Sequence, residues 1–120
     1  MYQLTSIYDT GSSYYNNTAS IGGVYYIVGS TSSKSTVILD SNNYYYNYGS
    51  VGGVIAAYDY FDITISSSYF YYNSATKGGV IYTAELSTNN NFVLLDVSSC
   101  VIYNNTATSG GVASIDHTLI

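Results

Sequence analysis

The sequence predicts an all-β protein, a parallel β-helix in which each coil of the chain contains one sequence repeat. Three observations support this prediction: a repeat that recurs four times at intervals of 26 to 32 residues, alternation of apolar and polar residues within it, and a composition rich in Ser, Thr, Asn, Gly and Tyr, which favour strands and turns over helices. We therefore expect a single domain over residues 1–120 with about four coils.

The repeat is defined by a Gly-Gly-Val triplet and by an asparagine five residues before it. A tyrosine stands two residues before the asparagine, and a large side chain stands three before it. Chance does not reproduce these positions in one register four times, so each repeat should form the same structural unit. The asparagines are Asn17, Asn47, Asn73 and Asn105, and the glycine pairs are Gly22-Gly23, Gly52-Gly53, Gly78-Gly79 and Gly110-Gly111.

Each repeat contains two predicted strands. The first precedes the asparagine, where apolar residues alternate with polar ones, as at Val37 and Leu39. The second starts at the valine after the glycines, as in residues 24–28. Asp9 replaces one apolar residue of the first strand in the first repeat, so we expect the first coil to be incomplete or open to solvent there.

Other repeat architectures fit this pattern less well. Helical repeats require amphipathic helices, a propeller blade requires about 40 residues, and leucine-rich repeats require a leucine lattice that the sequence lacks. In a parallel β-helix, equivalent residues lie above one another at about 4.8 Å. We expect the asparagines to form a hydrogen-bonded ladder and the glycine pairs to form a turn close to the core. The small residues six positions before each asparagine are expected to fit tightly into the coil: Gly11, Ser41, Ser67 and Ser99.

The four units resemble the repeats of chlamydial polymorphic outer-membrane proteins, which carry Phe-x-x-Asn and Gly-Gly-Ala-Ile/Leu/Val motifs and have counterparts in large ciliate surface proteins. The first motif corresponds to residues 14–17, 44–47, 70–73 and 102–105, with tyrosine or isoleucine in place of most phenylalanines, and the second to the Gly-Gly-Val triplets. The resemblance covers nearly the whole chain. It implies a right-handed parallel β-helix of the pectate-lyase type and a role in adhesion or display at the cell surface.

The tyrosines two residues before each asparagine should point outward if the residues three before it point inward. They would then form a ladder of phenols on one face, made of Tyr15, Tyr45, Tyr71 and Tyr103. One interpretation is mutual stacking that stabilises the fold. The other is a flat aromatic strip that binds glycans or a neighbouring fibre.

Charge and composition exclude several classes of function. The formal net charge is −5, and the two cations are both lysines, too few to bind a nucleic-acid backbone. No apolar run approaches the roughly 20 residues of a membrane-spanning helix, and the first residues lack the pattern of a secretory signal. The single cysteine allows no disulfide within the chain, and nothing in the sequence indicates a cofactor or metal site.

An enzyme of this fold would need paired acids or a basic residue beside calcium-binding acids. Asp59 and Asp62 are the only close acidic pair, and we interpret them as solvated residues at a junction between a loop and a strand. Lys34 and Lys77 fall in different coils. The sequence therefore favours a non-catalytic protein over a carbohydrate-active enzyme.

Two further reactive side chains lack partners at a recognisable spacing. His117 stands alone near the end of the sequence, and we interpret it as structural or exposed. Cys100 occupies a position where the other repeats have a small polar residue, so we interpret it as a substitute for that residue rather than as a nucleophile.

The sequence indicates a structural and adhesive module outside the cell. Asn16 and Asn104 are acceptors in Asn-x-Thr sequons, so each is a possible glycosylation site in a eukaryotic secretory route. Neither end of the sequence has a polar capping repeat, and uncapped strands seek partners. We expect a segment of a longer solenoid or a unit that stacks into filaments, with itself or glycans as partners.

Overall fold

The computed structural model describes residues 6–29, 34–59, 61–84 and 93–116. These residues contain sixteen strands and no helix, and the strands form four parallel sheets. The first sheet contains β1 (Ser6–Thr10), β5 (Ser35–Asp40), β9 (Phe61–Ser66) and β13 (Val93–Ser98). The second contains β2 (Ser13–Tyr15), β6 (Asn43–Tyr45), β10 (Tyr69–Tyr71) and β14 (Val101–Tyr103). The third contains β3 (Thr18–Ile21), β7 (Tyr48–Val51), β11 (Ser74–Lys77) and β15 (Thr106–Ser109). The fourth contains β4 (Tyr25–Val28), β8 (Ile55–Tyr58), β12 (Ile81–Ala84) and β16 (Ala113–Asp116).

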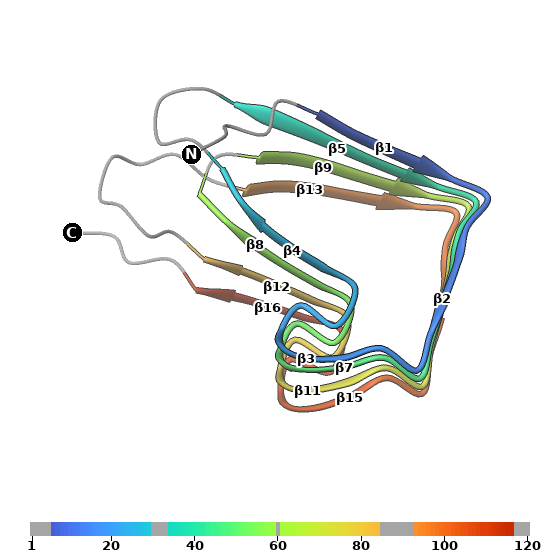
Figure 1. Ribbon diagram of the computed structural model, residues 1–120, viewed down its shortest axis with the longest axis vertical. Helices are drawn as coiled ribbons and strands as arrows, with labels where there is room; N and C mark the ends of the chain where they lie inside the picture. Colours follow the sequence, from blue (N-terminus) through green and yellow to red (C-terminus); the bar gives the residue numbers. More distant parts are fainter. Residues whose placement is uncertain (1–5, 30–33, 60, 85–92, 117–120) are drawn as a thin grey trace.

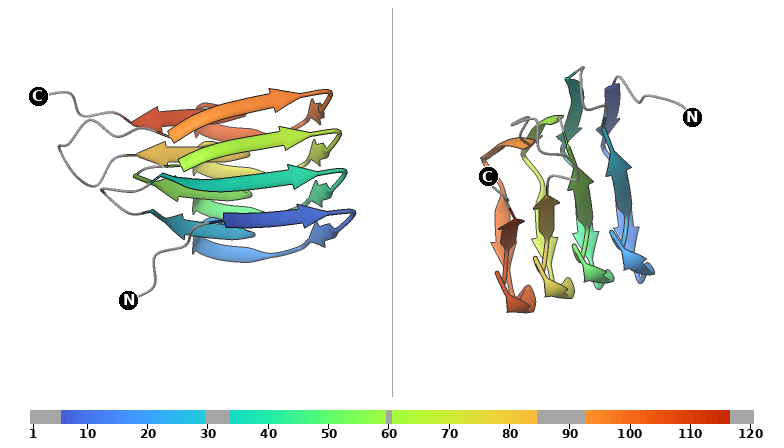
Figure 2. Two further views of the ribbon diagram at one scale, coloured as in Figure 1. Left: turned by 90° about the horizontal axis from the view of Figure 1, so that it is seen from above. Right: turned by 90° about the vertical axis from the view of Figure 1, so that its left-hand side faces the viewer.

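Each repeat contributes one strand to every sheet, and the chain returns to the first sheet three times (Figure 1). In Figure 1 the chain runs clockwise from β1 to β4. Figure 2 shows the coils stacked in sequence order, with the first coil on the side nearest the viewer of Figure 1. The fold is therefore a right-handed parallel β-solenoid of about three full turns in four tiers of strands, which confirms the predicted fold class.

Equivalent residues of the repeats lie above one another. In the second sheet Tyr14 pairs with Tyr44, Tyr44 with Phe70 and Phe70 with Ile102. The same register holds in the other three sheets, although the repeats differ in length. The stacking predicted from the repeat is thus present in every sheet.

The interior consists of apolar columns that run along the solenoid axis. Val37, Leu39, Ile63 and Ile65 point inward from the first sheet and are at most 1% exposed. Tyr44 and Phe70 fill the interior from the second sheet, and the ring centroids of these two residues lie 4.7 Å apart. The middle two coils supply most of the fully buried side chains, because each has a neighbouring coil on both sides.

Two corners of each coil are made by single residues with a positive φ. One of these corners is made by the serines that stand six positions before the motif asparagines. We expected these serines to fit tightly into the coil, and that expectation is wrong. They are exposed and adopt the left-handed conformation, as Ser41 does at φ 58°. A small residue is favoured there because a left-handed corner crowds the Cβ atom. The second corner is made by the residue just before each motif asparagine: Asn16, Tyr46, Tyr72 and Asn104. These corners delimit the strands of three or four residues that the sequence pattern did not reveal.

The two glycines of each pair have different roles. Gly52 has a φ of 69°, and a Cβ atom there would lie 2.2 Å from the carbonyl oxygen of Ile55. Gly53 has no positive φ, but its Cβ would lie 2.1 Å from the carbonyl oxygen of Gly79 in the next coil. The first glycine permits the turn within a coil, and the second permits two coils to approach each other.

Asp9 is not directed at solvent, as one reading of the sequence suggested. It lies at an inward position of β1, and its carboxylate accepts hydrogen bonds from the hydroxyl groups of Ser12, Tyr14 and Tyr25. Burial opposes ionisation of Asp9, but these three hydrogen bonds outweigh it and lower its pKa. These hydroxyl groups therefore donate the hydrogen bonds that water would otherwise donate to the carboxylate.

Candidate contact surface

The four motif asparagines form a hydrogen-bonded ladder at the corner between the second and third sheets. The side-chain oxygen Oδ1 of Asn73 accepts hydrogen bonds from both the backbone N and the Nδ2 of Asn47, each at 3.0 Å. The Nδ2 of Asn73 also donates to the backbone oxygen of Tyr44 at 2.9 Å. The pattern repeats from Asn17 through Asn105. Asn47 and Asn73 are fully buried, so this ladder holds the adjacent corner rigidly in place.

A second polar column lies five residues before the motif asparagines, at the position that Cys100 occupies in the fourth repeat, and it carries hydrogen bonds that the sequence did not predict. Asn42 accepts a hydrogen bond from the backbone N of Ser12 at 2.7 Å, and its own backbone N donates to the Oγ of Ser68 at 3.1 Å. Cys100 occupies the same column, and its Sγ donates to the backbone oxygen of Ser98 as the Oγ of Ser68 does to that of Ser66. Cys100 therefore lies where the sequence placed it, in a position of small polar residues.

The outward tyrosines Tyr15, Tyr45, Tyr71 and Tyr103 form one stack along the solenoid axis. Successive ring centroids are 5.1, 5.0 and 5.3 Å apart, and the ring planes deviate from parallel by 9° or less. The parallel register of the second sheet sets this spacing, because it brings the four Cα atoms into one column. Tyr15 at 55% exposed and Tyr103 at 44% exposed end the stack.

A second, shorter stack lies beside this ladder. Tyr46 and Tyr72 occupy the left-handed corner, and their rings are 5.1 Å apart and nearly parallel. They meet the ladder edge to face, with Tyr46 at 74° to Tyr45. The possible glycosylation residues Asn16 and Asn104 occupy the same corner position in the first and fourth coils and are exposed.

The stacking determines which atoms of these tyrosines can meet a partner. Rings within the ladder have a neighbour on each face, so their edges and hydroxyl groups are the parts that remain available. Desolvation between the neighbouring rings, together with the charges that Tyr45 and Tyr103 carry when ionised, raises the pKa of Tyr71. The surface is therefore a row of ring edges and hydroxyl groups rather than a flat aromatic strip. We call Tyr15, Tyr45, Tyr71, Tyr103, Tyr46 and Tyr72 the tyrosine surface.

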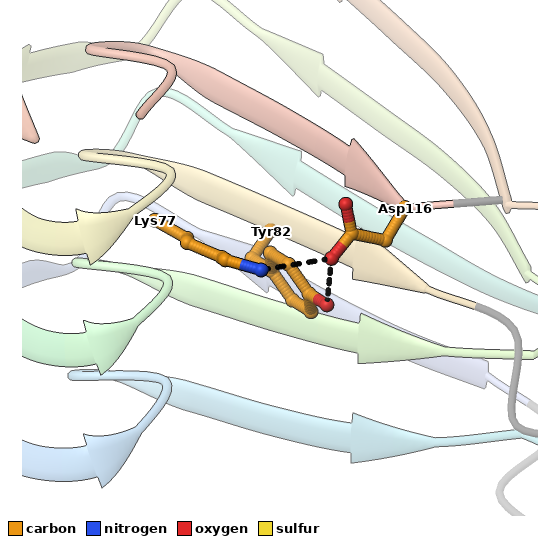
Figure 3. Close-up of polar contacts among 3 residues, drawn as sticks. All are labelled: Lys77, Tyr82 and Asp116. Atoms are coloured by element: carbon orange, nitrogen blue, oxygen red, sulfur yellow. Dashed lines mark hydrogen bonds and ion pairs between the residues drawn. The ribbon is translucent and has the colours of Figure 1, made fainter. Parts of the chain in front are cut away.

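A polar cluster of Lys77 from the third sheet with Tyr82 and Asp116 from the fourth sheet links the third and fourth coils (Figure 3). Asp116 accepts a hydrogen bond from the hydroxyl group of Tyr82 and lies 3.4 Å from the Nζ of Lys77. The hydrogen bond from Tyr82, aided by the positive charge of Lys77, lowers the pKa of Asp116. Both charged side chains are about half exposed, so the ion pair itself contributes little to stability.

The acidic pair considered for catalysis does not consist of two solvated residues, so that part of the interpretation is wrong. Asp59 is 3% exposed, and Asp62 forms an ion pair with Lys34 at 3.1 Å. Asp62 also lines a hollow of about 280 Å³ on the outside of the first sheet. The other residues that line it come from β9 and β13: Ile63, Thr64, Leu94, Leu95 and Asp96. Lys34 and Lys77 each neutralise a different carboxylate.

Within the described ranges, no three His, Cys, Asp or Glu side chains are grouped so that they could hold a metal ion. His117 lies outside the described residues. No helix in the described part of the chain is long and apolar enough to cross a membrane.

Fold and surface together define the class of protein: a parallel β-solenoid with a tyrosine-rich outer face. Comparison with protein-family models, curated proteins and solved structures finds no match to this chain.

Proposed function

We propose that this chain is a non-catalytic structural and adhesive module of an extracellular or cell-surface protein, and that it acts through its tyrosine surface and through stacking of its coils. The observation that carries this proposal is the continuous column of outward-facing tyrosines, held in register by a buried asparagine ladder. Such an arrangement is rigid before any partner binds, so little conformational entropy is lost on contact.

The resemblance to polymorphic outer-membrane protein repeats supports the same function. The aromatic residue and the asparagine of its first motif occupy two stacked columns, since Tyr44 lies over Phe70 and Asn47 is bonded to Asn73. The glycines of its second motif make the close approach between coils. We propose that this chain shares the architecture of those repeats and their role in adhesion or display.

The geometry favours association with another protein surface over binding of a glycan. Sugars pack against the open face of an aromatic ring, whereas the rings of Tyr45 and Tyr71 have their faces covered by neighbours. Hydroxyl groups and ring edges suit the edge-to-face contacts that another row of tyrosines provides. Glycan binding through the hydroxyl groups is the second candidate function.

The double variant Tyr45→Ser/Tyr71→Ser tests the proposed contact surface. We expect it to weaken self-association in sedimentation velocity by at least about tenfold in dissociation constant, because it removes the centre of the ladder. Its matched control is Tyr8→Ser/Tyr26→Ser, which removes two exposed tyrosines from the first and fourth sheets.

Retention on immobilised glycans, measured for the same variants, separates the two functions. Loss of retention with self-association unchanged would establish the glycan-binding function instead. If the double variant and its control behave like the unmodified chain in both assays, the tyrosine surface is not a contact surface.

A further inference from the structure

The two ends of the solenoid expose complementary halves of the asparagine ladder. In the first three coils, each motif asparagine donates from its backbone N and its Nδ2 to the Oδ1 of the asparagine in the next coil. In the fourth coil, no described residue accepts these hydrogen bonds from Asn105. In the first coil, no described residue donates to the Oδ1 of Asn17. One end therefore presents donors in the geometry that the acceptor at the other end requires.

The glycine corner shows the same complementarity in shape. A Cβ atom on Gly23, Gly53 or Gly79 would lie 2.1 to 2.2 Å from the carbonyl oxygen of the second glycine in the next coil. A Cβ on Gly111 would meet only the carbonyl oxygen of Asn105, at 3.6 Å. The fourth coil thus keeps open the space into which the second glycine of a following coil would fit.

The fourth coil leaves apolar side chains exposed at positions where the equivalent residues of the second and third coils are buried. Val112 is 42% exposed, whereas Val54 and Val80 in the same column are fully buried. Ala113 follows Tyr25, Ile55 and Ile81 in one column of paired residues. A small residue at this end leaves room for the large Tyr25 of a first coil.

We propose that a second copy of this chain docks its first coil onto the fourth coil, head to tail, so that the four sheets and both ladders continue across the junction. Asn105 would donate from its backbone N and Nδ2 to Oδ1 of Asn17 in the second copy, and Tyr15 of that copy would stack on Tyr103. This inference rests on the proposed function, because it specifies how the self-association occurs.

Asp9 of the docked copy would face Val97, an apolar residue that is 39% exposed. Its carboxylate keeps its three internal hydrogen bonds from Ser12, Tyr14 and Tyr25 in that position. The junction therefore leaves this carboxylate hydrogen-bonded even when it is covered.

Gly111→Ala tests the junction with little effect on the isolated chain. The added methyl group has ordinary van der Waals clearance within one copy but would collide with Gly23 of a docked copy. We expect the unmodified chain to form rods whose length increases with concentration, seen in electron micrographs and in sedimentation velocity. Gly111→Ala should raise the dissociation constant at least about tenfold without changing the midpoint of urea unfolding at low concentration.

Two further variants complete the test. Val112→Lys places a charge on the same end face. The long lysine side chain reaches solvent in the single copy but not in a docked pair. We therefore expect Val112→Lys to weaken association as Gly111→Ala does. Thr108→Ala removes an exposed side chain from the outer surface of the same coil and should leave association unchanged.

The outcomes distinguish this junction from the tyrosine surface. If Gly111→Ala and Val112→Lys associate like the unmodified chain while Tyr45→Ser/Tyr71→Ser does not, association is lateral, and the head-to-tail inference is overturned while the proposed function stands. If only the end-face variants weaken association, the junction is supported and the tyrosine surface is not. An unmodified chain that stays monomeric at all concentrations overturns both.

Discussion

Single residues in unusual backbone conformations determine where each coil turns. Tyr46 and Tyr72 adopt the left-handed conformation, which costs a residue with a side chain roughly 1–2 kcal/mol. Each directly precedes a motif asparagine that is fully buried and bonded to the coils before and after it. The asparagine ladder therefore holds the corner in a conformation that tyrosine alone would not adopt.

The second glycine of each pair is required because adjacent coils come very close together. We expect Gly53→Ala to lower the free energy of unfolding by about 1–3 kcal/mol or more, since its Cβ would lie 2.1 Å from a carbonyl oxygen that the neighbouring sheets hold in place. Urea denaturation followed by circular dichroism measures this change. Gly111→Ala is the matched control, and an equal loss in both variants would refute the steric explanation.

At the scale of the element, the column across coils matters more than the individual strand. Strands of three residues such as β2 and β6 are too short to be stable alone. They are held by columns of equivalent side chains, apolar on the inside and aromatic on the outside. Stability therefore comes from the number of stacked coils, as in other repeat proteins.

The asparagine ladder makes a specific prediction at this scale. Replacing Asn73 with alanine leaves the buried backbone N of Asn47 and the backbone oxygen of Tyr44 without these partners. At about 1–3 kcal/mol for each of these two unpaired buried groups, we expect Asn73→Ala to destabilise the fold by about 2–6 kcal/mol in urea denaturation.

Asn43→Ala is the matched control for the ladder, because Asn43 lies on the outward side of β6 and is only partly buried. We expect its effect to stay below about 0.5 kcal/mol. Comparable losses from both substitutions would mean that the ladder is not a principal source of stability.

At the scale of the whole molecule, the first two coils are joined by a polar network inside the solenoid. Tyr25 hydrogen-bonds with both Asp9 and Tyr44, and Asn42 donates to the hydroxyl group of Tyr44. Burial raises the pKa of Tyr25 and Tyr44, and for Tyr25 the hydrogen bond to Asp9 raises it further. Both phenols are therefore protonated in the folded protein well beyond the pH at which a free tyrosine ionises.

This network predicts a loss of stability in alkali. The unfolded chain releases its tyrosine protons near pH 10, whereas folded Tyr25 and Tyr44 retain theirs. Since the unfolded state then binds fewer protons, the free energy of unfolding falls as the pH rises above about 10 and is unaffected by these groups below it. Urea denaturation at a series of pH values measures this slope.

Tyr25→Phe removes one of the two buried phenols and should make the alkaline slope shallower, although it also loses the hydrogen bonds to Asp9 and Tyr44. A slope identical to that of the unmodified chain would show that Tyr25 ionises equally in both states.

The fourfold repeat was enough to predict the solenoid, the columns of equivalent residues and the outward direction of Tyr15, Tyr45, Tyr71 and Tyr103. An identical pattern in every repeat can bury its apolar side only if the repeats stack in register, so these features follow from periodicity alone. Periodicity could not reveal β2 or β3 and their equivalents, because three or four residues are too few to show an alternation.

The amino-acid sequence by itself determined which residues share a column; the tertiary structure decided what each column can do. The ring faces of the tyrosine ladder are covered because the sheet spacing places successive phenols 5.0 to 5.3 Å apart with nearly parallel planes, which no one-dimensional pattern encodes. Asp9 is hydrogen-bonded to Tyr25, and Lys77 is paired with Asp116, because coiling brings residues distant in sequence together. The direction of each hydrogen bond in the asparagine ladder likewise depends on how one coil lies over the next.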